Sequence, residues 1–172
     1  MKQTIAWYER TSWLHQALTQ GGALLVAHDS EGRPNPMTIG WGQVGIVWSV
    51  PVFTVLVRKS RYTHECVNAC AAFTVNVPRP GELKEALALC GTRSGRDLDK
   101  AAAAGLTMVP ATAVDGSVID GCAIQYECEI VARTQQERGQ FSAHEILTTY
   151  YKAGDHHLVV FGRIVAARAD TE

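Results

Sequence analysis

A group of basic and hydroxyl side chains follows an apolar run in the first half of the chain. The run covers residues 52–57, and the residues after position 63 have a helical pattern. The group itself consists of Arg58, Lys59, Ser60, Arg61 and Thr63. Helix N-termini and the planar donor fork of arginine both favour phosphate groups. The spacing predicts a phosphate site with Thr63 as the helix N-cap. Taken alone, a solvated strand end is the slightly simpler interpretation.

Two further groups place charged side chains near turns. Lys100 follows the polar loop Ser94-Gly95-Arg96-Asp97, and it could serve a phosphate or a carbonyl oxygen, or lie on an ordinary surface helix. Asp155, His156 and His157 precede the last expected strand. Because adjacent strand residues point to opposite faces, at most one of the two histidines faces a given site. A histidine in such a turn is also often purely structural.

Asn35 stands between two prolines at the start of an expected strand over residues 37–41. Pro34 and Pro36 restrict the residues before them to extended conformations. The polar groups of Asn35 and Thr38 should therefore lie beside flat apolar surface. Together with the basic group, this suits a ligand with a flat heteroaromatic head and a phosphate tail. The sequence contains no P-loop, no dinucleotide-type glycine fingerprint and no nucleophile elbow.

Length and composition favour one domain over residues 1–172. Hydrophobic residues make up 47% of the chain, which is enough for a core, and the net charge of -1 gives no nucleic-acid footprint. The apolar runs are too short to span a membrane and no signal segment is evident, so we expect a cytoplasmic protein. The five cysteines are an odd number. We expect them to be reduced and buried, without a disulfide framework or a metal site.

Most of the expected elements are strands. They cover residues 23–27, 37–41, 52–57, 73–77, 122–131 and 158–166, and residues 146–151 are expected to extend a hairpin. Short helices are expected over residues 12–20, 64–71, 82–90 and 98–104. A doubly wound sheet would need a long helix after each strand. The pattern therefore predicts a mainly β protein, a barrel or sandwich with a few short helices.

Six motifs in this order resemble the flavin reductase-like family of FMN-binding split barrels, which includes flavoredoxin. They are Asn35-Pro36-Met37-Thr38 with Trp41; Trp48-Ser49-Val50-Pro51; Arg58 to Thr63; Phe73-Thr74-Val75-Asn76; Ser94-Gly95-Arg96-Asp97 with Asp99-Lys100; and Gly154-Asp155-His156. The resemblance covers about residues 22–167. It implies a mainly β, Greek-key split barrel that dimerises with its flavin near the interface.

The resemblance also implies roles for individual residues. The side chains expected along the flavin are Asn35, Pro36, Met37, Thr38, Trp41 and Ser49. Those expected at the ribityl phosphate are Arg58, Ser60, Arg61 and Thr63. Lys100 and His156 are expected to reach the flavin, and His156 is expected to act on hydride transfer.

The implied function is reduction of FMN by NAD(P)H, with the reduced flavin supplied to a partner such as a monooxygenase. The alternative is a flavoredoxin-like FMN electron carrier, or a binding module without NAD(P)H turnover of its own. A homodimer is expected, and neither nucleic acid nor a membrane is an expected partner. The segment over residues 134–152 is longer than the family's usual connection before the Gly-Asp-His turn.

Overall fold

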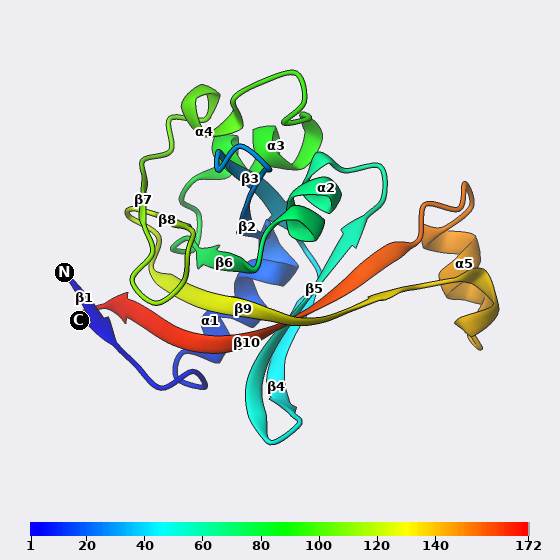
Figure 1. Ribbon diagram of the computed structural model, residues 1–172, viewed down its shortest axis with the longest axis horizontal. Coiled ribbons are helices and arrows are strands. Elements are labelled where there is room, and N and C mark those ends of the chain that lie inside the picture. The colour runs from blue at the N-terminus through cyan, green and yellow to red at the C-terminus, as the bar shows by residue number, and fades with distance from the viewer. Residues whose placement is uncertain (172) are drawn as a thin grey trace.

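The computed structural model describes residues 1–171, which form one twisted antiparallel sheet flanked by short helices (Figure 1). Seven of its strands lie in the order β3-β2-β6-β9-β10-β5-β4, and the N-terminal strand β1 pairs with β10. The strands of this sheet are β1 (Lys2–Thr4), β2 (Ala23–His28), β3 (Pro34–Ile39), β4 (Gly42–Val47), β5 (Val50–Arg58), β6 (Ala72–Val77), β9 (Ile124–Gln135) and β10 (His157–Asp170). A separate two-stranded ribbon joins β7 (Met108–Pro110) and β8 (Ser117–Ile119).

The helices are short and lie between the strands. They are α1 (Thr11–Gln20), α2 (Tyr62–Ala69), α3 (Lys84–Thr92), α4 (Lys100–Ala103), the 3₁₀ turn η1 (Arg138–Gln140) and α5 (His144–Tyr150). Figure 1 shows α2, α3 and α4 together over β2 and β3, whereas α5 lies apart at the far end of β9 and β10. The mainly β fold expected from the sequence is confirmed.

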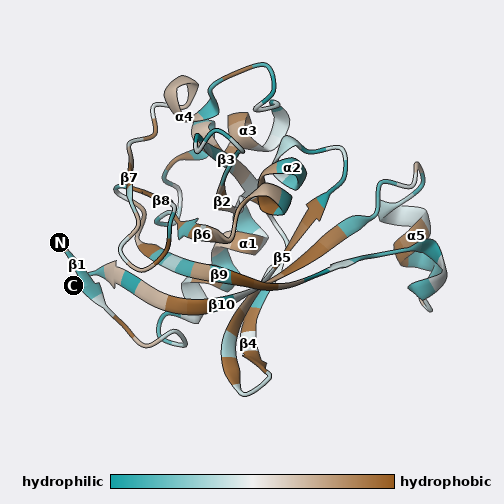
Figure 2. Cartoon of the chain, in the orientation of Figure 1, coloured by the Kyte–Doolittle hydropathy of each residue, from teal (hydrophilic) through white to brown (hydrophobic). Residues whose placement is uncertain are grey.

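The two longest strands, β9 and β10, connect the two ends of the sheet. Their register shifts twice, between Phe161 and Gly162 and between Ile164 and Ala166, which lets the pair bend. A Cβ at position 162 would lie 2.5 Å from the ring of Phe73, so glycine is required at this close approach. Hydrophobic residues concentrate where β5, β9 and β10 cross (Figure 2), and the rings of Phe53 and Tyr126 meet there edge to face at 5.3 Å.

Two local expectations are wrong. Residues 146–151 do not extend a hairpin, because α5 and its C-cap occupy them. Leu147 and Tyr151 are buried four residues apart, which is the spacing of one helix face. Thr63 is not the N-cap of α2, since Arg61 holds that position with extended backbone angles. The side chain of Thr63 is instead buried inside the first turn.

Three global features bear on the class of the protein. No helix within residues 1–171 is both long enough and apolar enough to cross a bilayer. All five cysteines are unpaired, and four of them are buried. In the same residues no group of three or more His, Cys, Asp or Glu side chains could hold a metal ion.

Candidate functional site

Two adjoining cavities lie where β3, the end of β5, the start of α2 and the 155–157 turn meet. The smaller one has a volume of about 170 Å³ and is lined by Met37, Thr38, Ile39, Gly40, Trp41, Leu56, Arg58, Arg61 and His157. The larger one has a volume of about 290 Å³ and is lined by Met37, Arg58, Ser60, Arg61, Tyr62, Thr63, Cys90, Thr92, Arg93, Ser94, Gly95, Arg96, Lys100 and Asp155. Met37, Arg58 and Arg61 belong to both, so the two cavities form one continuous site.

Strand β3 joins the two sides of this site. The buried Asn35 donates from Nδ2 to Oγ1 of Thr63 at 2.8 Å, which ties the strand to α2. A Cβ at Gly95 would lie 2.2 Å from Oδ1 of Asn35, so only glycine lets the 94–96 loop approach so closely. Thr38 donates from Oγ1 to the carbonyl oxygen of Leu87 at 2.6 Å and ties β3 to α3. The strand therefore holds both helices at the cavity wall.

Arg58 and Ser60 bind the turn before β10. The Arg58 guanidinium donates to the carbonyl oxygens of Asp155 and Tyr150, each at 3.0 Å. Ser60 donates from its backbone N–H and its hydroxyl to the carboxylate of Asp155, at 3.0 and 2.7 Å. Burial alone would raise the pKa of Asp155, but the hydrogen bonds from Ser60 and the charge of Arg58 lower it below its ordinary value. Asp155 is therefore an anion that fixes this turn.

Lys100 is the buried lysine of the site. Its side chain is only 4% exposed, and within residues 1–171 no hydrogen bond or ion pair reaches its ammonium group. Helix α4 sets the position of Lys100, which is its first residue. The helix begins there because the side chain of Asp99, the N-cap, accepts a hydrogen bond from the backbone N–H of Ala102. Burial lowers the pKa of Lys100, the adjacent Cys90 opposes this shift, and Arg61 adds to it. A buried ammonium of this kind favours an anionic ligand.

Further positive charge surrounds the larger cavity. Arg61, Arg93 and Arg96 all line it. Arg96 forms an ion pair with Glu65, and its guanidinium lies 5.5 Å from the ring of Tyr62. Asp155 is the sole carboxylate along the described lining of this cavity, and Ser60 and Arg58 already engage it. The cavity therefore has an excess of positive charge.

The smaller cavity has an aromatic wall. The ring of Trp41 lies 4.9 Å from Tyr150 and 5.1 Å from His157, so α5 and β10 both reach it. Nδ1 of the buried His157 lies 2.7 Å from the hydroxyl of Tyr151. Burial, reinforced by the charge of Arg58, lowers the pKa of His157 to about 4. This imidazole is therefore neutral at neutral pH.

His156 points away from both cavities. Its ring stacks on Tyr151 at 4.8 Å and lies 5.8 Å from Phe141, and its Nε2 is buried without a hydrogen-bond partner. Strand β10 begins at His157, and the alternation of faces places that residue at the cavity. Of the two histidines, the structure thus brings His157, and not the expected His156, to the other site residues.

The remaining expected residues divide into two sets. Those that line one or both cavities are Met37, Thr38, Trp41, Arg58, Ser60, Arg61, Thr63 and Lys100, and Asn35 supports the wall. Pro36 is buried in β3 and lines neither cavity. Ser49 lies in the β4–β5 turn with a φ of 60° and is exposed, away from both cavities. The expectation that these two side chains join the site within one chain is not met.

The fold also brings to the site residues that the sequence did not single out for it. They include Leu56, Cys90, Thr92, Arg93, Tyr150 and, in place of His156, His157. Arg93 directly precedes the Ser94-Gly95-Arg96 motif, so a basic run was available as a signal for it. Tyr150 lies in α5, where the sequence predicts a hairpin extension, and this helix brings its ring to Trp41.

Most of the sequence matches one protein family. The model of the flavin reductase like domain matches residues 15–172. The chain belongs to the flavin reductase-like domain family. Its sheet is the split barrel of such proteins. A relative from Archaeoglobus fulgidus, described as an uncharacterized protein, is 32% identical over 115 residues, which is 67% of this chain and 64% of that protein. The match thus spans less than two thirds of the relative's length.

Solved structures agree with this family assignment. Flavoredoxin from Methanosarcina acetivorans superposes with a TM-score of 0.67 at 26% identity, over 88% of this chain and 69% of that one. Nitrilotriacetate monooxygenase component B from Bacillus cereus superposes with a TM-score of 0.68 at 14% identity, over 96% of this chain and 80% of that one. The second likeness concerns the fold alone.

Proposed function

We propose that this family member binds FMN across the two cavities, with the phosphate in the larger and the flavin ring in the smaller. Lys100 carries the proposal, because this residue is only 4% exposed, its ammonium has no partner in the described residues, and it lines a cavity rimmed by arginines. A phosphate monoester brings nearly two negative charges, which such a set of donors accommodates. Arg61, Lys100 and the hydroxyl of Ser94 are the groups we assign to it.

The smaller cavity suits a flat ring. Met37 and Leu56 give it apolar surface, and Trp41 gives it an aromatic wall. Thr38 already donates its hydroxyl proton to Leu87, so its oxygen remains available as an acceptor. Asn35, Arg58 and Ser60 hold the surrounding backbone, since each is engaged within the protein. We therefore assign these three to positioning and Met37, Thr38 and Trp41 to ring contact.

The reaction that follows from such a site is hydride transfer from NAD(P)H to flavin. When bound, FMN supplies the hydride-accepting centre. The chain contributes orientation of the ring through Trp41 and Met37, which line the smaller cavity. His157, neutral and fixed by Tyr151, offers a hydrogen-bonding imidazole at the open side of the ring. A partner such as a monooxygenase would then use the reduced flavin.

The competing proposal is an FMN electron carrier without NAD(P)H turnover, which the likeness to a flavoredoxin favours. One observation separates the two. The purified, FMN-loaded protein is mixed anaerobically with NADH or NADPH and followed at the flavin absorbance. Bleaching in the absence of a partner supports the reductase, and unchanged absorbance with both nicotinamides leaves the carrier.

We further propose a homodimer built on the projecting β4–β5 hairpin. The exposed side chains there and on the neighbouring strands include Ile46, Trp48, Val131 and Val165, and Trp48 is 63% exposed. Figure 2 shows hydrophobic residues along this hairpin although it stands away from the body. Exposed apolar side chains of this size on a projecting hairpin favour an association surface. Light scattering during dilution tests the assembly, and a monomer that retains its flavin contradicts it.

A further inference from the structure

A third cavity lies on another part of the molecule and belongs to no step proposed above. Its volume is about 460 Å³, which is within the range of small-molecule sites and exceeds either cavity of the flavin site. It lies between α1, the turn after α1, the loop before α3, and α3 itself, and its lining residues are Trp13, Gln16, Ala17, Gln20, Gly21, Gly22, Pro78, Arg79, Pro80, Gly81, Glu82, Lys84, Leu87 and Ala88. None of these residues lines the flavin site.

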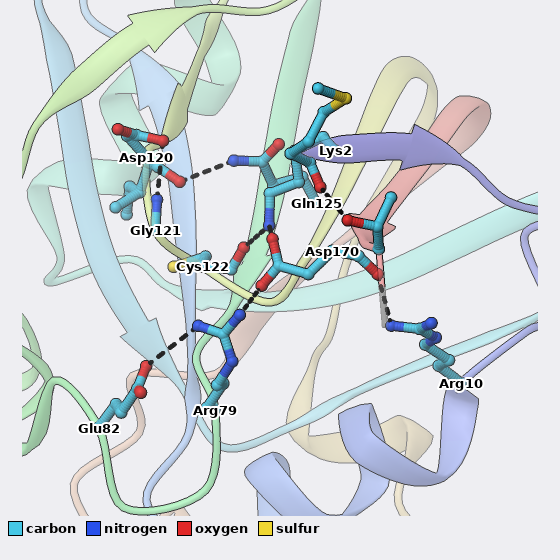
Figure 3. A network of polar contacts seen from close by, with 12 residues as sticks. Lys2, Arg10, Arg79, Glu82, Asp120, Gly121, Cys122, Gln125 and Asp170 are labelled. Atoms are coloured by element: carbon cyan, nitrogen blue, oxygen red, sulfur yellow. Dashed lines mark hydrogen bonds and ion pairs between the residues drawn. The ribbon is translucent and has the colours of Figure 1, made fainter.

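The rim of this cavity is held by a polar network (Figure 3). Asp170 at the end of β10 accepts from Lys2 at 2.8 Å and forms an ion pair with Arg79. Arg79 also lies 3.8 Å from the carboxylate of Glu82. Pro78 and Pro80 stiffen the loop that carries Arg79, because each fixes its own φ angle. The loop is therefore ordered before any ligand arrives.

One wall of the cavity is flat and apolar. Trp13 is 38% exposed, and the guanidinium of Arg10 lies 5.6 Å from its ring, which fixes the indole. Ala17, Leu87 and Ala88 continue the apolar surface along the two helices. Gln16 and Gln20 bring amide groups to the edge, where the Nε2 of Gln16 lies 3.3 Å from Oε1 of Gln20. Such a wall suits an aromatic ring with a polar substituent.

The charged residues at the cavity determine which polar substituent the aromatic ligand should carry. Arg79 is already neutralised by Asp170 and Glu82. Lys84 is exposed at the start of α3, and no hydrogen bond or ion pair within residues 1–171 engages its ammonium. One available cation matches one negative charge, and because Glu82 also lines the cavity, repulsion grows with a second negative charge on the ligand. We propose that this cavity is a second ligand site, specific for a planar aromatic monocarboxylate, with Trp13 against the ring and Lys84 at the carboxylate.

The test uses the full chain, ¹⁵N-labelled and saturated with FMN, titrated with benzoate at constant ionic strength. The amide signals of Gly21, Gly22 and Gly81 report on this cavity, and those of Gly40 and Gly95 report on the flavin site. We expect saturable shifts at the first three glycines. Benzyl alcohol, which lacks the charge, should bind about tenfold more weakly or worse, which corresponds to the loss of one charge-assisted contact.

Two variants complete the experiment. Lys84→Met keeps the apolar stem and removes the charge, so it should weaken benzoate binding about tenfold. Lys152→Met is the matched control on another exposed lysine and should leave binding unchanged. The proposal is overturned by non-saturating shifts, by shifts confined to Gly40 and Gly95, by equal affinity for benzyl alcohol, or by a Lys84→Met variant that binds like wild type. Since none of these readouts is flavin reduction, the result is independent of the proposed reductase activity.

Discussion

The hydroxyl of Tyr151 lies 2.7 Å from Nδ1 of His157, so the residue that ends α5 fixes the imidazole at the smaller cavity. The ring of Tyr151 also stacks on His156 at 4.8 Å and lies 5.2 Å from the guanidinium of Arg58. The long segment between β9 and β10 is thus part of the site's support. It links a cavity residue, a turn residue and the end of β5 through one buried ring.

Replacing Tyr151 with phenylalanine should destabilise the protein by about 1–3 kcal/mol. The substitution keeps the ring but leaves the buried Nδ1 of His157 and the part-buried Oε1 of Gln136 without their shared partner. Urea unfolding followed by circular dichroism measures the change. Tyr150→Phe is the matched control, because the hydroxyl of Tyr150 makes no hydrogen bond within residues 1–171 and the residue is exposed. Equal losses in both variants contradict this role of Tyr151.

His157 should make the protein less stable in mild acid. Its folded-state pKa of about 4 lies below the ordinary value of 6.5, so between these pH values the unfolded chain binds a proton that the folded chain does not. Stability is therefore complete above about pH 6.5 and falls as the pH drops through this window, by up to about 3 kcal/mol. Urea unfolding at several pH values, compared between wild type and His157→Gln, isolates this contribution. Parallel curves for the two proteins speak against it.

Lys100→Met should stabilise the flavin-free protein by about 1–3 kcal/mol. The residue is 4% exposed and its ammonium has no partner in the described residues, so removing its charge relieves a desolvation cost while methionine fills the space. The same variant should bind FMN more weakly, which gives opposite signs for folding and binding. Lys59 is exposed and lines neither cavity, so Lys59→Met should change neither the stability of the protein nor its affinity for FMN. A loss of stability in flavin-free Lys100→Met would show that another group satisfies this charge.

The sheet could be predicted from the sequence because burial imposes a clear alternation on its central strands. The 122–131 alternation located β9, and the apolar run at 52–57 located β5. The end of β9 could not be predicted in this way, because the strand continues through polar residues to Gln135, where it pairs with β10. Thr148 and Thr149 favour strands intrinsically, yet burial of Leu147 and Tyr151 makes the segment helical. In this segment tertiary packing outweighs the intrinsic strand preference of the residues.

The part of the site that could be predicted is mainly the part built from one continuous stretch of sequence. The residues of β3, β5 and the α2 start lie close in sequence, so their motif marked the cavity wall. Tyr150 and His157 reach it only through the β9–β10 connection, whose path no local pattern reveals. Ser49 lies in the β4–β5 turn, where a positive φ places it outside both cavities. Which of two adjacent histidines faces the site depended on a strand boundary known only from the fold.

The two histidines can be separated by kinetics. We expect His157→Ala to slow anaerobic bleaching of bound FMN by NAD(P)H, because it removes the imidazole beside Trp41. The loss should be about 10²-fold if proton transfer takes part, and smaller if the group only orients the nicotinamide. His156→Ala, which removes a ring stacked outside the cavities, should bleach at nearly the wild-type rate. The reverse order would restore His156 as the residue at the flavin.

The most direct test of the central claim compares FMN with riboflavin, which lacks the phosphate. Arg61 reaches the larger cavity, where we place the phosphate, so Arg61→Ala should weaken FMN binding by about 1.5–3 kcal/mol, or about ten- to a hundredfold. Riboflavin affinity should change little, and Lys59→Ala should affect neither flavin. Fluorescence titration of both flavins against the three proteins gives the four ratios needed. A selective loss of FMN affinity in Arg61→Ala is the predicted result, and an equal loss for riboflavin and FMN would contradict a phosphate site in the larger cavity.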